Sequence, residues 1–136
     1  MIKPSLILIV IFVLSQGFHV ANFQNCNRFK VGNFIYFQQD KNTYNKNLLA
    51  VRTTDQQINI DKEKGDTLVY DLTWTTPCHY QLILKSSNVK SVGLIQVGDT
   101  INVSLQPVNR RIFTYQSTFE KSGESMHFEG KMRKVK

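Results

Sequence analysis

The stretch Asp66–Leu84, with the sequence DTLVYDLTWTTPCHYQLIL, decides the fold of this chain. Large apolar side chains occupy every second position of its first half: Leu68, Tyr70, Leu72 and Trp74. Asp71 and Thr73 lie between the last three of them. Such alternation is typical of a half-buried β-strand, whose successive side chains point to opposite faces. The sequence Thr-Thr-Pro at 75–77 breaks the pattern, which resumes over residues 80–84. The stretch therefore predicts two consecutive strands joined by a short turn.

The same alternation recurs along most of the chain. In the run over residues 49–53, Leu49 and Val51 alternate with Arg52, which places Arg52 on the face opposite to these apolar residues. Loops are expected over 39–47 and 86–96, where no period is visible. The expected strands, besides the two above, cover residues 34–37, 49–53, 58–61, 101–106, 113–116 and 126–129.

About eight strands joined mostly by short turns form an up-and-down meander. Such a meander leaves two edges exposed unless its first and last strands pair. We therefore predict an all-β fold, an antiparallel up-and-down barrel of about eight strands, whose interior is just wide enough for side chains or one small ligand. An open sandwich of two sheets is the competing arrangement.

The N-terminal residues have the pattern of a secretory signal peptide. A basic start at Met1–Lys3 is followed by an apolar run, Leu6–Leu14, and by small residues at Ser15 and Gly17. The apolar run is well short of the ~20 residues that a membrane-spanning helix needs. We expect a signal peptide over 1–17, a single domain over 18–136 without a transmembrane segment, and export to the periplasm or the medium.

Export changes how the two cysteines are interpreted. In an oxidising compartment, Cys26 and Cys78 most simply pair with each other as a disulfide. The alternative roles are a nucleophile or a metal ligand. Neither residue has neighbours that would lower a thiol pKa or complete a zinc site.

The chain is basic, with a formal charge of +7. In an exported protein this charge does not serve nucleic acid, so the candidate partners are anionic envelope surfaces or an envelope protein. A solvated basic tail that keeps the protein soluble is the simpler interpretation. The basic residues of that tail fall within the last six positions: Lys131, Arg133, Lys134 and Lys136.

Two motifs resemble a known group of proteins. The first is Cys26-x-x-Phe29-x-x-Gly32-x-Phe34-x-Tyr36, and the second is Trp74-x-x-x-Cys78-x-Tyr80-x-Leu82. Together they resemble small exported two-cysteine proteins of Bacteroidota that are lipocalin-like in predicted shape. Automatic naming sometimes labels such proteins as DNA topoisomerase IV subunits, yet this chain shows no nuclease or ATP-binding pattern. The resemblance implies a lipocalin-like barrel and export, and it implies no catalytic residues.

No arrangement of residues predicts an enzyme. The histidines His19, His79 and His127 have no partners at metal-ligand spacing, and Asp71 and Glu129 face away from the apolar side of their strands. No nucleophile elbow or phosphate-binding glycine loop is present. We therefore expect a protein without catalytic residues, metal or cofactor.

The remaining candidates for function are aromatic residues on the inward faces of the predicted strands. If the barrel is not fully packed, tyrosine hydroxyls among them would give an apolar pocket a few polar groups, the usual composition of a small-molecule site. A filled core is the competing interpretation, in which case an envelope interaction module with a packed interior is the alternative function. The candidate ligand-lining residues are Phe34, Tyr36, Tyr70, Trp74, Tyr80, Phe113, Tyr115 and Phe128.

Overall fold

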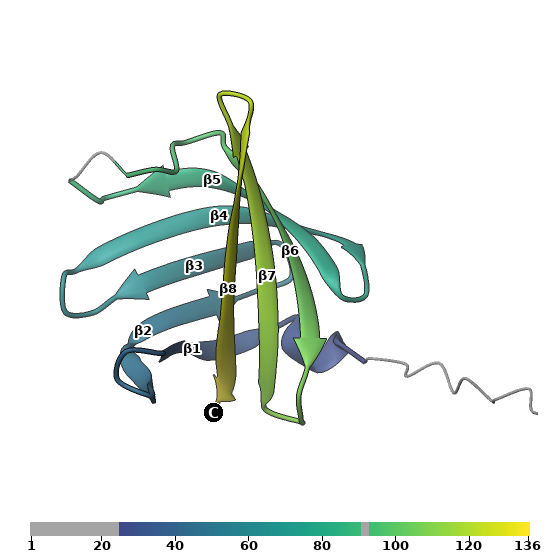
Figure 1. Cartoon of the computed structure of the whole chain (residues 1–136). Coiled ribbons are helices and arrows are strands. Elements are labelled where there is room, and N and C mark those ends of the chain that lie inside the picture. The colour runs from purple at the N-terminus through teal and green to yellow at the C-terminus, as the bar shows by residue number, and fades with distance from the viewer. Residues whose placement is uncertain (1–24, 91–92) are drawn as a thin grey trace, which may run out of the picture.

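The computed structural model describes residues 25–90 and 93–136, and these form a closed barrel of eight antiparallel strands in chain order (Figure 1). The predicted all-β up-and-down barrel is therefore confirmed, and the sandwich is excluded. The expected signal peptide over 1–17 lies outside the described residues. The strands are β1 (Gly32–Gln38), β2 (Thr43–Arg52), β3 (Gln56–Asp61), β4 (Asp66–Thr76), β5 (His79–Ser87), β6 (Thr100–Pro107), β7 (Ile112–Lys121) and β8 (Glu124–Val135).

The barrel closes because β8 pairs with β1 along the residues that the sequence suggested were a free tail. The last strand was expected over 126–129, but it runs to Val135, and Asn33 of β1 lies opposite that residue. Lys131, Arg133 and Lys134 are thus strand residues and not a solvated tail. The alternation is hard to recognise in the sequence because basic residues lie on both sides of Met132. Met132 nevertheless points inward and is only 2% exposed.

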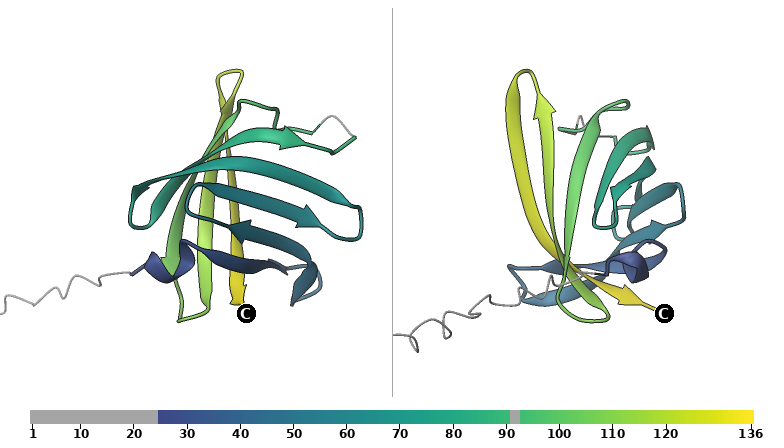
Figure 2. Two further views of the ribbon diagram at one scale, coloured as in Figure 1. Left: turned by 180° about the vertical axis from the view of Figure 1, so that it is seen from behind. Right: turned by 90° about the vertical axis from the view of Figure 1, so that its right-hand side faces the viewer.

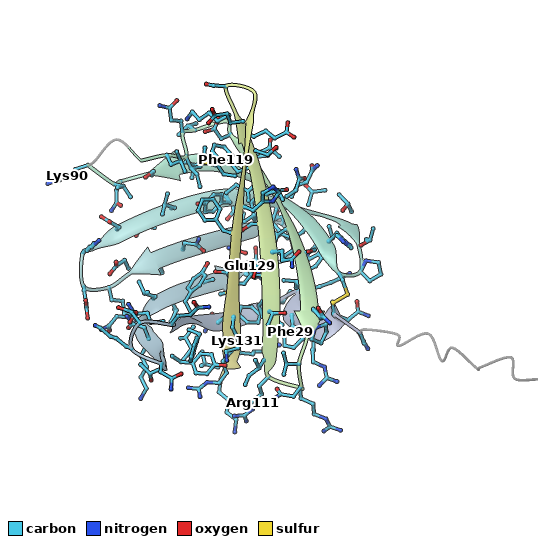
Figure 3. The ribbon with its side chains drawn as sticks, in the orientation of Figure 1. Phe29, Lys90, Arg111, Phe119, Glu129 and Lys131 are labelled. Carbon is cyan, nitrogen blue, oxygen red and sulfur yellow. A yellow bond between two sulfur atoms is a disulfide. The ribbon has the colours of Figure 1, made fainter. Side chains whose placement is uncertain are left out.

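One end of the barrel is covered by a short 3-10 helix, η1 (Asn27–Phe29), which lies at the same end as the C-terminus (Figures 1 and 2). Phe29 is fully buried there, and its ring centroid lies 4.8 Å from that of Phe113. The disulfide between Cys26 and Cys78 fixes η1 to the turn between β4 and β5 (Figure 3). The predicted pairing of the two cysteines is confirmed. Among the described helices, none is long and apolar enough to cross a membrane.

Strand β2 has the reverse of the expected inside and outside. The alternation placed Arg52 opposite the apolar face, but Arg52 and Ala50 are the inward residues, 2% and 0% exposed. Ala50 lies opposite Phe34 of β1, so the register carries its neighbours Leu49 and Val51 to the outer face. Arg52 therefore faces the interior together with Ala50.

The segment 39–47, expected to be a loop, contains the start of β2 at Thr43. Ile35 of β1 pairs with Leu49 of β2, but the next residue of β1, Tyr36, pairs with Asn45. The register between the two strands therefore shifts at this point. The irregularity leaves extra residues on β2 and interrupts its two-residue period. This interruption is the reason that the alternation was not visible in the sequence.

We expect the disulfide to be a major source of stability. The bond joins residues 52 positions apart, and restricting the unfolded chain over such a loop is worth about 4 kcal/mol in the chain-entropy description. The double variant Cys26→Ala, Cys78→Ala should therefore lose about 2–4 kcal/mol of unfolding free energy, as measured by urea denaturation. An unchanged denaturation midpoint would show that η1 is held to the barrel without the bond.

Candidate functional site

The interior of the barrel contains a cavity of about 270 Å³ above the end that η1 covers. One side of this cavity is apolar and comes mainly from β5–β8 and the loop between β5 and β6. The apolar residues are Leu82, Ile95, Ile101, Val103, Phe119, Phe128 and Met132. The polar residues are Arg52, Gln57, Asn59, Ser117 and the tyrosines Tyr36, Tyr70, Tyr80 and Tyr115. The cavity is thus amphipathic, with most of its polar side chains on β1–β4.

Arg52 is the central polar residue of the cavity floor. Its Nε donates a hydrogen bond to Gln57 Oε1 at 2.8 Å, its Nη1 to the Phe29 carbonyl at 2.9 Å, and its Nη2 to the Tyr80 hydroxyl at 2.6 Å. The guanidinium carbon also lies 4.7 Å from the centroid of the Phe34 ring and 5.3 Å from that of Phe113. These contacts connect η1 with strands β1, β3, β5 and β7 around a single side chain.

The four inward tyrosines stay neutral phenols. Burial raises the pKa of Tyr36 and of Tyr80 above the ordinary value of 10.0, although the positive charge of Arg52 acts in the opposite direction on both. Burial also raises the pKa of Tyr70 and Tyr115. The cavity therefore presents hydroxyl groups that donate and accept hydrogen bonds and carry no negative charge.

Tyr115 occupies its place because Gly130 lies opposite it on β8. A Cβ atom on Gly130 would overlap the Tyr115 ring and hydroxyl, so only glycine leaves room for the ring to lie against the β8 backbone. In this position the Tyr115 ring meets the Tyr36 ring edge-on at 6.2 Å between centroids. The Tyr36 hydroxyl also donates to Asn59 Oδ1 at 3.3 Å. The two tyrosines are thus positioned by backbone space and by a cross-barrel contact.

The structure brings five of the eight candidate residues to the cavity: Tyr36, Tyr70, Tyr80, Tyr115 and Phe128. Phe128 borders it with 45% of its surface exposed, so the cavity reaches solvent beside β8. Phe34 and Phe113 instead pack beneath the cavity around Arg52 and Phe29.

Trp74 is the third candidate that does not line the cavity. It stacks behind Tyr80, with ring centroids 4.7 Å apart, and Lys30 Nζ lies 5.2 Å from the centroid of its ring. Its Nε1 is buried without a hydrogen-bond partner among the described residues. Trp74 therefore belongs to the packing of the covered end.

Sequence reasoning missed the polar residues of the cavity, above all Arg52 and Gln57. Both are nearly fully buried, at 2% and 3% exposed. The usable signal was the two-residue spacing that puts Gln57 and Asn59 on one face of β3 and Ile58 and Ile60 on the other. Only the closed barrel shows that the polar face is the inner one.

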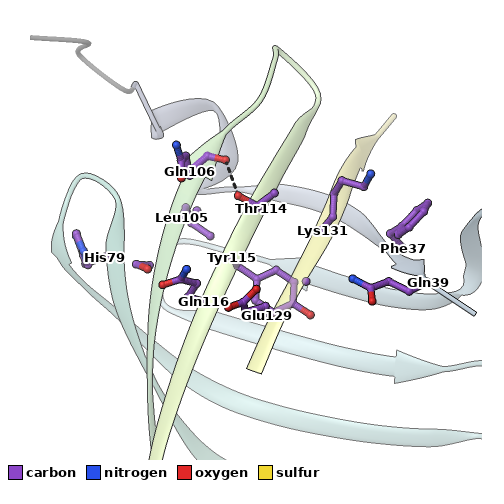
Figure 4. A pocket seen from close by; sticks show the side chains of 12 residues that line it. Phe37, Gln39, His79, Leu105, Gln106, Thr114, Tyr115, Gln116, Glu129 and Lys131 are labelled. Carbon is purple, nitrogen blue, oxygen red and sulfur yellow. Dashed lines mark hydrogen bonds between the residues drawn. The ribbon is translucent and has the colours of Figure 1, made fainter. Parts of the chain in front are cut away.

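A second hollow, of about 620 Å³, lies on the outer surface of β6–β8 (Figure 4). Polar residues border most of it, and several of them are exposed, among them Gln106, Gln116 and Glu129. The single hydrogen bond that Figure 4 draws in this hollow runs from the Thr114 hydroxyl to the Gln106 carbonyl at 3.5 Å. A ligand there would stay in contact with water. The interior cavity is the better candidate because its walls are mostly buried.

In the described ranges, no group of three or more His, Cys, Asp or Glu side chains could hold a metal ion. His79 instead shares a hydrogen bond of 2.7 Å with the Thr76 hydroxyl on the surface.

The chain was also compared with known proteins. No protein-family model, curated protein or solved structure matches it. The function of the interior cavity is therefore inferred from the residues that line it.

The buried tyrosines predict how stability responds to alkaline pH. Because their phenol pKa values are raised in the folded state, the native protein binds more protons than the unfolded chain above pH 10.0. The free energy of unfolding should therefore fall as pH rises past that value. Urea denaturation at a series of alkaline pH values measures the free energy of unfolding, and the ultraviolet absorbance of phenolate measures the ionisation of the tyrosines.

The variant Tyr36→Phe is the control for this titration. It removes one of the raised phenols, so its stability should fall less steeply with pH than that of the wild type. Phenolate absorbance from all five tyrosines that appears in the folded wild-type protein near pH 10.0, with no loss of stability, would contradict the burial of these hydroxyls.

Proposed function

We propose that this protein is a non-enzymatic binding protein that holds a small amphipathic molecule inside its barrel. The observation that carries the proposal is the cavity of about 270 Å³, which has an apolar side and a polar side. Ligand sites in proteins are typically concave and mostly apolar, with a few placed polar groups. An eight-stranded barrel has room for one such ligand.

The inward polar residues of β2 and β3 support this proposal. A barrel that only needed a filled core would gain stability from turning Leu49, Val51, Ile58 and Ile60 inward, since these apolar side chains are only partly buried on the outer face. The chain places these residues on the outer face instead and lines the interior with hydrogen-bonding groups. A departure of this kind from the usual pattern is expected at a functional site.

The competing function, an envelope interaction module with a packed interior, fits this cavity less well. Export remains part of the proposal. A buried disulfide between Cys26 and Cys78 supports an oxidising compartment, and the resemblance to exported lipocalin-like proteins of Bacteroidota supports it as well. The proposed protein is therefore a periplasmic or secreted carrier.

Filling the cavity tests the proposal. Ser117 lies inward on β7 opposite Phe128, and it borders the cavity. We expect Ser117→Phe to weaken binding of the neutral fluorescent probe N-phenyl-1-naphthylamine by about tenfold or more, because the new ring occupies the space of the probe. Probe fluorescence measured during titration gives the affinity.

The matched control is Thr118→Phe, which adds the same ring to the outer face of the same strand, where residue 118 borders a surface hollow. This variant should bind the probe like the wild type. Thermal melts establish that both variants are folded, and Ser117→Leu provides a smaller filling change. Equal probe affinity in all the folded variants would refute an interior binding site.

A further inference from the structure

We propose that the natural ligand is an organic carboxylate whose charged head group binds at Arg52 and whose apolar chain points toward the cavity mouth. This inference rests on the proposed function and adds the chemical class of the ligand. It starts from the charge of Arg52, which is 2% exposed and borders the cavity.

Arg52 is a buried cation without an anionic partner in the described part of the chain. The two ion pairs found there, Lys85–Asp71 and Lys121–Asp99, involve other residues. The groups that receive its hydrogen bonds are the amide oxygen of Gln57, the carbonyl of Phe29 and the hydroxyl of Tyr80. All three are neutral, and buried charges in proteins are ordinarily paired.

The aromatic rings around Arg52 do not supply the missing negative charge. The rings of Phe34, Tyr80 and Phe113 lie within 4.7–5.3 Å of the guanidinium carbon, and they attract it through their faces. Burial keeps Tyr80 protonated because it raises the pKa of the phenol. The floor of the cavity therefore keeps a net positive charge.

Hydrogen-bond donors remain for a ligand at this floor. A guanidinium has five N–H groups, and Arg52 gives three to partners within the described residues. The Tyr80 hydroxyl accepts from Arg52 and keeps its own proton to donate. Two guanidinium N–H groups and one hydroxyl match a carboxylate, whose two oxygens accept several hydrogen bonds.

The rest of the cavity fits an apolar chain. Val103 and Phe128 both lie level with Ser117 of β7, and Phe119 lies two residues farther from the covered end. The apolar side of the cavity therefore runs from Arg52 past Val103 and Phe128 toward Phe119. Figure 3 shows Phe29 of η1 near one end of the barrel and Phe119 near the other. A linear molecule with an anionic head and an apolar chain therefore matches both the charge and the shape of the cavity.

Octanoate and octanol distinguish this inference from the proposed function. The two probes share an apolar chain and differ in the charge of the head group at neutral pH. We expect the oxidised wild-type protein to bind octanoate at least about tenfold more tightly than octanol, measured by displacement of N-phenyl-1-naphthylamine. Equal affinities, or failure of both compounds to displace the bound probe, would overturn the inference and leave the proposed function standing. No binding of N-phenyl-1-naphthylamine, octanoate or octanol would overturn both.

A single substitution can supply the missing charge from within the protein. Gln57→Glu keeps the size of the side chain and puts a carboxylate at the position of the amide oxygen, 2.8 Å from Arg52 Nε. We expect the preference of the variant for octanoate over octanol to fall by about tenfold or more, and this ratio corrects for any effect of the substitution on the cavity itself. The control Gln106→Glu makes the same charge change at an exposed residue on β6 and should change neither affinity.

A measurement on the wild type keeps the test valid if Gln57→Glu does not fold. The Nε–Hε signal of Arg52, assigned in the wild type through its side-chain carbons by triple-resonance NMR, should shift when octanoate is added and stay in place with octanol. Octanoate that binds without moving this signal would place the carboxylate elsewhere and refute the inference.

Discussion

The structure depends on the burial of one guanidinium group. Arg52 is buried with three of its five N–H groups hydrogen-bonded, to the Phe29 carbonyl of η1, to Gln57 of β3 and to the Tyr80 hydroxyl of β5. Loss of any one acceptor leaves a buried charged donor unsatisfied, which is among the more costly defects in a protein. The covered end of the barrel, the position of η1 and the floor of the cavity are therefore one cooperative unit, and the disulfide from Cys26 holds the same end from outside.

The two halves of the barrel contribute differently. Strands β5–β8 are apolar inside and polar outside, as their alternation indicates, and they provide hydrophobic burial through residues such as Leu105 and Phe119. Strands β2 and β3 bury less apolar surface and place polar groups toward the interior. There the Gln57 side-chain amide donates a hydrogen bond to Asn59 Oδ1 at 3.0 Å. The division produces a cavity that has an apolar side and a polar side, and it explains why the space is lined by neutral donors and one cation.

The sequence was a good guide to the fold and a partial guide to the site. Strict alternation in β4–β7 predicted the strands and most of the inward aromatics, because burial on one face and the two-residue period of a strand coincide there. The alternation could not predict that β2 turns Arg52 inward, since the inward face is set by pairing with β1 after an irregularity at Ile35. Likewise, nothing in the sequence indicated that Gly130, just beyond the strand expected over 126–129, makes room for the ring of Tyr115.

Methyl NMR of the oxidised protein tests the central claim most directly, because it locates a bound molecule inside or outside the barrel. With octanoate added, the account expects shifts and ligand contacts at the inward methyl groups of Leu82, Ile101 and Val103. The outward methyl groups of Ile58 and Ile60 should be unaffected. Shifts confined to these outward residues, with the inward methyl groups unchanged at saturation, would contradict an interior site.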